Sequence, residues 1–160
     1  MGQGGLSLTF RSARPEDMAG IVATSAETGW EQLSAREREG VTPEDFAARV
    51  AGMFHHALSA PGGALLVAED SGKVVGYILF CLQPNNLTGR LEGFFFDQFV
   101  EPEYRHRGLA QELNARAMER CAGLGATGVS LLIAPHNGDS LKAARRSGFK
   151  VERLIFSRPL

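Results

Sequence analysis

The sequence predicts one α/β domain, residues 1–160, in which a mixed and mostly antiparallel sheet carries helices on both faces. Three observations lead to this class. Stretches with strand periodicity alternate with stretches of helical spacing along the whole chain. Two apolar runs between residues 63 and 82 are joined by Glu-Asp-Ser-Gly-Lys, which is typical of an antiparallel hairpin. A strand, a helix of about 15 residues and a second strand between residues 91 and 134 form a right-handed crossover, which makes these two strands parallel.

The first half of the chain contains a strand and two helices ahead of the hairpin. Residues 6–11 alternate apolar and polar side chains, which predicts a strand. Helical spacing follows up to Trp30 after a Pro-Glu-Asp start. A second helix is expected to begin at Thr42, a good N-cap, with Pro43 at the first helical position, and to run to about Leu58.

The second half begins with an aromatic strand over 91–100, expected to be buried on both faces for part of its length. Apolar residues then recur at 109, 113, 117, 121 and 124, which predicts a helix with one apolar stripe. A strand over 126–134 and a short helix closed by Gly148 follow. Residues 150–160 are predicted to form a final strand.

The composition excludes several classes of protein. A formal net charge of −1 and a pI near 6.4 argue against a nucleic-acid-binding surface spread over the chain. No apolar run reaches the roughly 18 residues that a membrane span needs. The two cysteines, in apolar surroundings, suit a reducing compartment, so we expect a cytoplasmic protein. His55 and His56 have no second ligand pair at metal-binding spacing, and no metal site is predicted.

A basic turn stands directly before the helix that begins near residue 109. Arg105, His106 and Arg107 precede Gly108, and the first backbone N–H groups of the helix lack partners within it. These donors, the helix dipole and the guanidinium groups favour an anion such as a phosphate or pyrophosphate. Gly108 would let that anion approach the backbone. The alternative is a solvated turn whose arginines pair with glutamates at 101, 103 or 112. The patterns G-x-x-x-x-G-K-S/T and G-x-G-x-x-G are both absent.

Two motifs resemble those of the GNAT superfamily of acyl-CoA-dependent N-acetyltransferases. Residues 105–110, Arg-His-Arg-Gly-Leu-Ala, are similar to the signature R/Q-x-x-G-x-G/A, and Val-x-Pro-x-Tyr stands in front of them at 100–104. About 30 residues later, Asn137-x-x-Ser140 and then Ser147-Gly148-Phe149 resemble the element N-x-x-A/S…G-F. The resemblance is specific from about residue 91 to 149, and the order of elements before it also fits. It implies a GNAT-like fold.

The resemblance further implies that acetyl-CoA is the donor. The amides of residues 105–110 would hold the pyrophosphate of the coenzyme, and the main chain near Val100 would bind its pantetheine arm as an additional strand. Asn137 would contact the coenzyme from the other side or, alternatively, cap the short helix. The residues expected to bind coenzyme are Phe99, Val100, Arg105, His106, Arg107, Gly108, Leu109, Ala110 and Asn137.

The implied chemistry requires a base, because an alkyl ammonium with a pKa of about 10.4 is almost fully protonated at neutral pH. The carboxylates on the aromatic strand are Asp97 and Glu92. Asp97 is preferred as the base or as the anchor of a water relay, since members of the family often carry an acid three residues before the position of Val100. Both carboxylates also have structural interpretations: Asp97 could bond a neighbouring backbone, and Glu92 could be solvated.

The sequence departs from the family at Ala144, where many members carry a tyrosine that protonates the leaving thiolate. The thiolate would then leave unassisted or through water, which its ordinary pKa of about 8.5 permits, or Tyr77 or Tyr104 would reach the site. The expected function is transfer of an acetyl group from acetyl-CoA to a primary amine of a small molecule or peptide, without a covalent enzyme intermediate. The alternative is a non-catalytic acyl-CoA sensor. A homodimer is consistent with the resemblance, because many relatives pair through their last strands.

Overall fold

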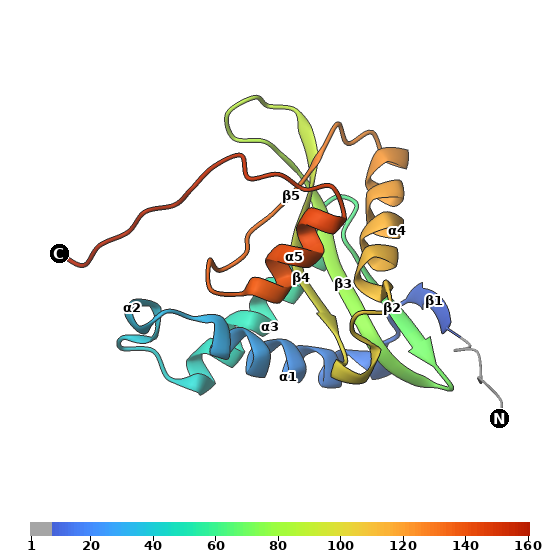
Figure 1. Cartoon of the computed structure of the whole chain (residues 1–160), viewed down its shortest axis with the longest axis horizontal. Coiled ribbons are helices and arrows are strands. Elements are labelled where there is room, and N and C mark those ends of the chain that lie inside the picture. The colour runs from blue at the N-terminus through green and yellow to red at the C-terminus, as the bar shows by residue number, and fades with distance from the viewer. Residues whose placement is uncertain (1–7) are drawn as a thin grey trace.

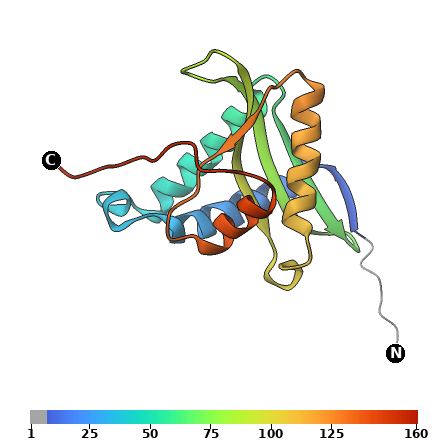
Figure 2. The same ribbon diagram turned by 45° about the horizontal axis from the view of Figure 1, so that its top comes forward.

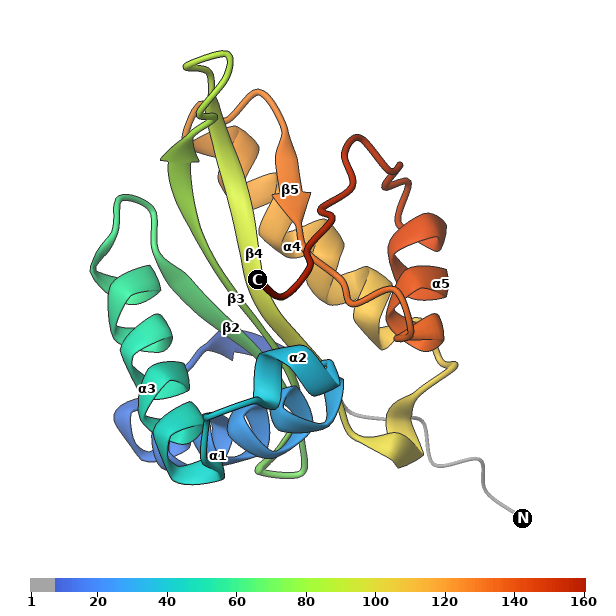
Figure 3. The same ribbon diagram turned by 90° about the vertical axis from the view of Figure 1, so that its left-hand side faces the viewer.

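The computed structural model describes residues 8–160, which form three layers (Figure 3). The helices α1 and α3 cover one face of the central sheet, and α4 and α5 lie on the other. The predicted α/β class with helices on both faces is therefore confirmed. In chain order the elements are β1 (Leu8–Ser12), α1 (Pro15–Gln32), α2 (Ala35–Arg38), α3 (Pro43–Ser59), β2 (Ala64–Asp70), β3 (Lys73–Pro84), β4 (Leu91–Val100), the 3-10 turn η1 (Pro102–Tyr104), α4 (Leu109–Gly123), β5 (Val129–Leu131) and α5 (Gly138–Arg146) (Figure 1).

Within residues 8–160 the sheet has five strands in the order β1-β2-β3-β4-β5. The pairs β1/β2, β2/β3 and β3/β4 are antiparallel, whereas β4 and β5 are parallel. The mixed sheet and its single parallel pair agree with the crossover predicted between residues 91 and 134. None of the described helices is long and apolar enough to cross a membrane.

The predicted helix starts at Pro15 and Pro43 are confirmed by their caps. The Thr42 hydroxyl accepts a hydrogen bond from the backbone N–H of Asp45 at 3.1 Å, which satisfies one of the free donors of α3. The short helix α2 was not predicted, although its signal is present. Ser34 and Glu37 form a reciprocal capping box, Ser-x-x-Glu, at 2.9 and 3.2 Å.

The apolar core has two halves, one on each face of the sheet. On one side α4 buries most of its predicted stripe, including Leu113, Ala117 and Cys121, against the sheet, whereas Leu124 is the C-cap and is 49% exposed. On the other side α1 and α3 pack on each other and on the sheet, with Phe54 almost fully buried. Both cysteines are buried free thiols, so they act as packing residues here.

Three predicted strands differ from the structure. The strand predicted over 6–11 forms over 8–12 in the described residues, and positions 6 and 7 lie outside them. The strand predicted over 126–134 is reduced to Val129–Leu131. The final strand predicted over 150–160 is wrong, because this segment is exposed and has no strand beside it (Figure 2). A strand needs a hydrogen-bonded neighbour, and periodicity alone does not supply one.

Gly93 gives a stability prediction that arises from this packing. A Cβ there would stand 2.6 Å from Cys121 Sγ and 2.9 Å from Val129 Cγ1. We expect Gly93→Ala to lower the free energy of unfolding by about 1–3 kcal/mol, because overpacking displaces α4 or β5. Urea denaturation measures this difference. Gly52→Ala is the matched control: its Cβ meets no atom within 4 Å on α3, so it should stabilise by about 0.5–1 kcal/mol. Equal effects of both substitutions would contradict the packing argument.

Candidate functional site

A β-bulge in β4 decides which way the candidate base points. Leu79 of β3 pairs with Asp97, and the next residue, Phe80, pairs with Phe95, so Phe96 is an extra residue in β4. A bulge of this kind bends the strand and re-aims the side chains that follow, and bulges are frequent beside active sites. Beyond Phe96 the alternation of β4 is therefore shifted by one residue.

The two faces of β4 beyond the bulge have different neighbours. Asp97 and Phe99 lie on the side of α1 and α3, where Tyr77 and Leu79 also lie. Gln98 lies on the opposite side, where its side-chain Nε2 donates to the carbonyl of Ala110 at 3.0 Å. This hydrogen bond fixes the start of α4 against β4.

Asp97 lies in a largely apolar environment with a hydrogen-bond donor beside it. The Tyr77 hydroxyl donates to Asp97 Oδ2 at 2.8 Å. Burial raises the pKa of the Asp97 carboxyl above its ordinary value, and hydrogen bonds from Ser25, Tyr77 and the Gln98 backbone partly offset this effect. A carboxylate with a raised pKa is a better proton acceptor than a solvated one, and such groups gather at functional sites.

The strands β4 and β5 separate directly after the bulge. They pair only over residues 93–95 of β4 and 129–131 of β5. In the described part of the chain, no strand pairs with the outer edge of β4 from Phe96 to Val100. This free edge faces the side on which α4 and α5 lie (Figure 3). It offers backbone N–H and C=O groups to an extended ligand, as the sequence predicts for a pantetheine arm.

The basic turn at the start of α4 has the backbone of an anion site. His106 has a φ of 59° and Gly108, the N-cap, has a φ of 81°, so both are in the left-handed region. Left-handed residues in such a turn direct successive N–H groups into one concavity. Among the described residues, no main-chain carbonyl accepts a hydrogen bond from the amides of Arg107, Gly108, Leu109 or Ala110. The side chains of residues 105–108 are exposed. This turn fits a pyrophosphate.

The two arginines of the turn have different surroundings. Arg105 Nε donates to the carbonyl of Val100 at 2.9 Å, and its guanidinium lies 5.8 Å from the ring centroid of Phe99. Arg105 thus ties the turn to the end of β4 and occupies the Val100 carbonyl. In the described chain no carboxylate forms a salt bridge with Arg107.

None of the three glutamates proposed as alternative partners forms a salt bridge with an arginine of the turn in the described chain. Glu101 pairs with Lys73 at 3.6 Å, and Glu112 pairs with Arg116 at 2.8 Å. Glu103 is exposed and forms no salt bridge in the described chain. The solvated-turn interpretation thus loses the ion pairs on which it depended.

Of the predicted site residues, Glu92 lies far from Asp97, and Asn137 has a structural role as a helix cap. Glu92 is five residues from Asp97 on β4, a separation of roughly 17 Å along an extended strand. Its Oε1 accepts a hydrogen bond from Asn85 Nδ2 at 3.0 Å. Asn137 is the N-cap of α5, where its Oδ1 accepts from the N–H of Ser140 at 3.1 Å. The structure thus brings Asp97, but not Glu92, to the free edge of β4.

Neither Tyr77 nor Tyr104 is suited to protonate the leaving thiolate in place of the tyrosine that many family members carry at the position of Ala144. Ala144 is 8% exposed on α5. The Tyr104 hydroxyl donates to Asp70 Oδ2 at 2.8 Å, at the turn between β2 and β3. Burial, followed by the charge of Asp97 and the hydrogen bond to it, raises the pKa of Tyr77 far above its ordinary value. A phenol with such a pKa is a poor proton donor to a thiolate.

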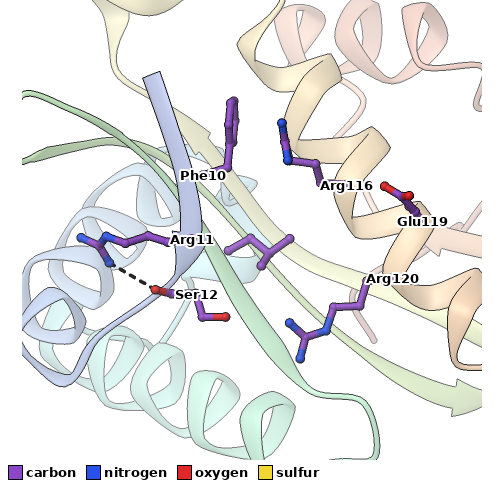
Figure 4. A pocket seen from close by; sticks show the side chains of 7 residues that line it. Phe10, Arg11, Ser12, Arg116, Glu119 and Arg120 are labelled. Atoms are coloured by element: carbon purple, nitrogen blue, oxygen red, sulfur yellow. Dashed lines mark hydrogen bonds between the residues drawn. The ribbon is translucent and has the colours of Figure 1, made fainter. Parts of the chain in front are cut away.

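A cavity of about 290 Å³ lies between β1 and α4 (Figure 4), and its lining includes no residue of β4. Two of its three basic side chains already have partners. Arg11 forms salt bridges with Asp17 and Glu69, and Arg116 lies 4.1 Å from the ring centroid of Phe10 besides its pairing with Glu112. Arg11 and Arg116 are therefore not free to hold an anion, and Arg120 is the lining arginine without a salt bridge among the described residues.

Ser25 was not predicted as a site residue, and Tyr77 was predicted only as a possible acid. Their proximity to Asp97 depends on the packing of α1 on the sheet and on the bulge at Phe96. Neither feature has a local sequence signal. Within residues 8–160, no group of three metal-ligating side chains comes together.

The chain is similar to known acetyltransferases in sequence and in fold. The model of the acetyltransferase (GNAT) family matches residues 27–149. A putative acetyl transferase from Pyrococcus furiosus superposes with a TM-score of 0.82 at 19% identity, covering 96% of this chain and all of that one. An aminoglycoside N-acetyltransferase AAC(6')-Iy in complex with CoA gives 0.65 at 23%, covering 99% of each chain. Glucosamine-6-phosphate N-acetyltransferase from Arabidopsis thaliana gives 0.63 at 17%, covering 96% and 98%. No match was found among curated proteins. The family match spans most of the chain, and we conclude that the protein belongs to the GNAT acetyltransferase family.

Proposed function

We propose that this acetyltransferase moves an acetyl group from acetyl-CoA directly to a primary amine of a small molecule or peptide. One observation carries the proposal: the free edge of β4 begins at a bulge beside Asp97 and leads to a turn with unpaired amides. One end of this arrangement suits proton removal, and the other suits a pyrophosphate. The aminoglycoside and glucosamine-6-phosphate acetyltransferases among the similar structures are N-acetyltransferases, which supports an amine acceptor here.

We propose the following roles for the residues of the site. Asp97 accepts a proton from the ammonium, directly or through water, and a free N–H at the edge of β4 donates to the oxygen on which charge develops. The amides of residues 107–110, with Arg107, hold the pyrophosphate. Acetyl-CoA supplies the acetyl group as a thioester. The new bond joins the amine nitrogen to the carbonyl carbon as the carbon–sulfur bond breaks, and the thiolate leaves without an acid from Ala144.

Direct transfer is preferred over an acetyl-cysteine intermediate because of the state of the two thiols. Cys81 and Cys121 are both buried, and burial raises the pKa of each thiol. The thiolate is the nucleophilic form, so neither residue is prepared for attack. The same free thiols suit a reducing compartment, and we expect the protein to act in the cytoplasm.

The test separates binding from chemistry. Purified protein is titrated with acetyl-CoA by calorimetry and then incubated with acetyl-CoA and a panel of peptides, polyamines, aminoglycosides and amino acids, while thiol release is followed. Saturable binding with release of thiol by one class of amine is the expected result. Binding without turnover of any amine would instead favour the non-catalytic sensor, which the absence of an acid at Ala144 makes a specific second candidate.

A homodimer is the assembly that we propose from the exposed carboxyl-terminal segment. Leu154, Ile155 and Phe156 are 71, 81 and 88% exposed, which is unusual for three consecutive large apolar residues. A second copy would bury them. We expect sedimentation velocity to give a dimer, and Ile155→Asp with Phe156→Asp to give a monomer that still binds acetyl-CoA. A monomeric parent protein would contradict this proposal.

A further inference from the structure

A small polar cluster lies in the apolar layer between the sheet and α1. Ser25 of α1 is 4% exposed and Tyr77 of β3 is 2% exposed, and both lie beside Asp97 of β4. The ring of Tyr77 packs against Phe54 and Phe99, with centroids 6.4 and 5.9 Å apart. Three elements distant in sequence thus bring the hydroxyl of Tyr77 and the buried Ser25 to one partly buried carboxyl, and the bond from Tyr77 is the one with a defined distance. Burying such groups costs free energy unless they are paired.

The two hydroxyls have one effect on Asp97 in common: both stabilise its charged form against burial. Tyr77 does so at a well-formed distance, 2.8 Å from its hydroxyl to Oδ2. Because Tyr77 itself stays protonated, it remains a donor whether Asp97 is charged or neutral. A donor of this kind fixes the carboxyl in one orientation and exchanges no proton with it.

Among the other described groups around Asp97, one backbone N–H shares this effect, and no charged side chain does. On β4 the backbone N–H of Gln98 also stabilises the carboxylate. On α3 the ring of His56 packs edge-on against Phe96, at 6.2 Å between centroids. On α1 the charged residue nearest in sequence to Ser25, Glu27, is exposed. Among the described residues, no basic side chain forms a salt bridge with Asp97.

We propose that Tyr77 and Ser25 are positioning residues that hold the Asp97 carboxylate in place for proton removal from the acceptor amine. The proposal rests on the proposed function and names two residues of that same site. During the reaction the proton passes from the ammonium to Asp97, and Tyr77 and Ser25 keep their own protons. Neither residue touches the reacting atoms.

The test is the pH dependence of kcat/KM for Tyr77→Phe and Ser25→Ala. Tyr77→Phe keeps the ring in the core and removes one hydrogen bond to a charged group, worth about 1.5–3 kcal/mol. The acid limb of the profile should therefore move upward by about one to two pH units. Ser25→Ala should move it in the same direction. Acetyl-CoA affinity should not change. If kcat/KM fell equally at every pH and the acid limb of the profile did not move, both residues would have only structural roles. That result would overturn the proposal.

A second measurement keeps the proposal testable without turnover. The carboxyl carbon of Asp97 is followed by NMR in protein labelled at the aspartate side chains, and Asp97→Asn identifies its signal. The apparent pKa should be higher in Tyr77→Phe than in the parent protein. An unchanged titration would contradict the proposal even if the enzyme were active. A raised titration in a protein that turns over no amine would show that the cluster exists and that the proposed function is the part that fails.

Discussion

Asp97→Asn is expected to lower kcat by about 10²–10⁴-fold while leaving acetyl-CoA binding unchanged, because a positioned base contributes an acceleration of that order. The amide keeps the size of the side chain and can still accept the hydrogen bond from Tyr77, but it cannot take a proton. Steady-state kinetics with the amine found in the panel, together with calorimetry, measures both quantities. The loss should appear in kcat and not in acetyl-CoA affinity. The side chain of Asp97 lies on the opposite face of β4 from Gln98, which contacts the start of α4, where the coenzyme is proposed to bind.

The matched control for this substitution is Glu92→Gln, on the same strand and with the same change of charge. Glu92 lies near the opposite end of β4, next to Asn85, so its turnover should stay within about twofold of the parent protein, as for surface changes away from a site. If Glu92→Gln loses activity and Asp97→Asn keeps it, the assignment of the base is wrong. If neither variant changes kcat, proton removal is left to solvent.

The stability of Asp97→Asn should move in the opposite direction from its activity. The pKa of Asp97 is raised in the folded protein, so the folded state holds more protons than the unfolded state between the two pKa values. Its contribution to stability therefore falls as the pH rises through this window, which begins at the ordinary aspartate value near 4. At neutral pH the neutral amide should raise the thermal midpoint. A lower midpoint would mean that the hydrogen bonds of the carboxylate outweigh its burial.

The geometry of the proposed coenzyme turn could be anticipated because its signals are local. The first free amides and the dipole of α4 depend on a few consecutive positions, and Gly108, expected there for close approach of an anion, has a φ of 81°. The catalytic half depends on register. Tyr77 and Asp97 are 20 positions apart, and they share a face only because Phe96 is bulged out of the ladder. Alternation along β4 gives the wrong face for Asp97 when the bulge is not known.

In the fold, too, the helix starts depend on local residues and have a signal in the sequence, whereas the extent of strand pairing depends on distant residues. Helix starts followed from capping residues, and even the unpredicted α2 has its capping box at Ser34 and Glu37. The wrong strand over 150–160 has apolar residues suited to a strand, but pairing depends on a neighbour that sequence periodicity does not reveal. The short β5 has the same origin, since β4 turns away after three paired residues.

Arg107→Glu is expected to weaken acetyl-CoA binding by about 100-fold or more. The substitution removes a charge-assisted contact to the pyrophosphate, worth about 1.5–3 kcal/mol, and adds a repelling carboxylate at the same place. Arg107 is the informative choice, because Arg105 also anchors the turn to the carbonyl of Val100 and its loss would disturb the backbone. Arg107 is exposed, so the fold should be unaffected. Calorimetry gives the affinity, and thermal denaturation without ligand checks the fold.

Arg90→Glu is the control for this reversal of charge. It changes the net charge by the same amount on an exposed loop that leads into the opposite end of β4 from the turn. A general electrostatic effect on a polyanionic ligand would weaken binding in both variants, and raising the ionic strength would remove the difference from the parent protein in each case. A local pyrophosphate contact predicts a large loss for Arg107→Glu alone. Unchanged affinity in Arg107→Glu would contradict the assignment of the turn, and the unpaired amides of residues 107–110 would then need another ligand.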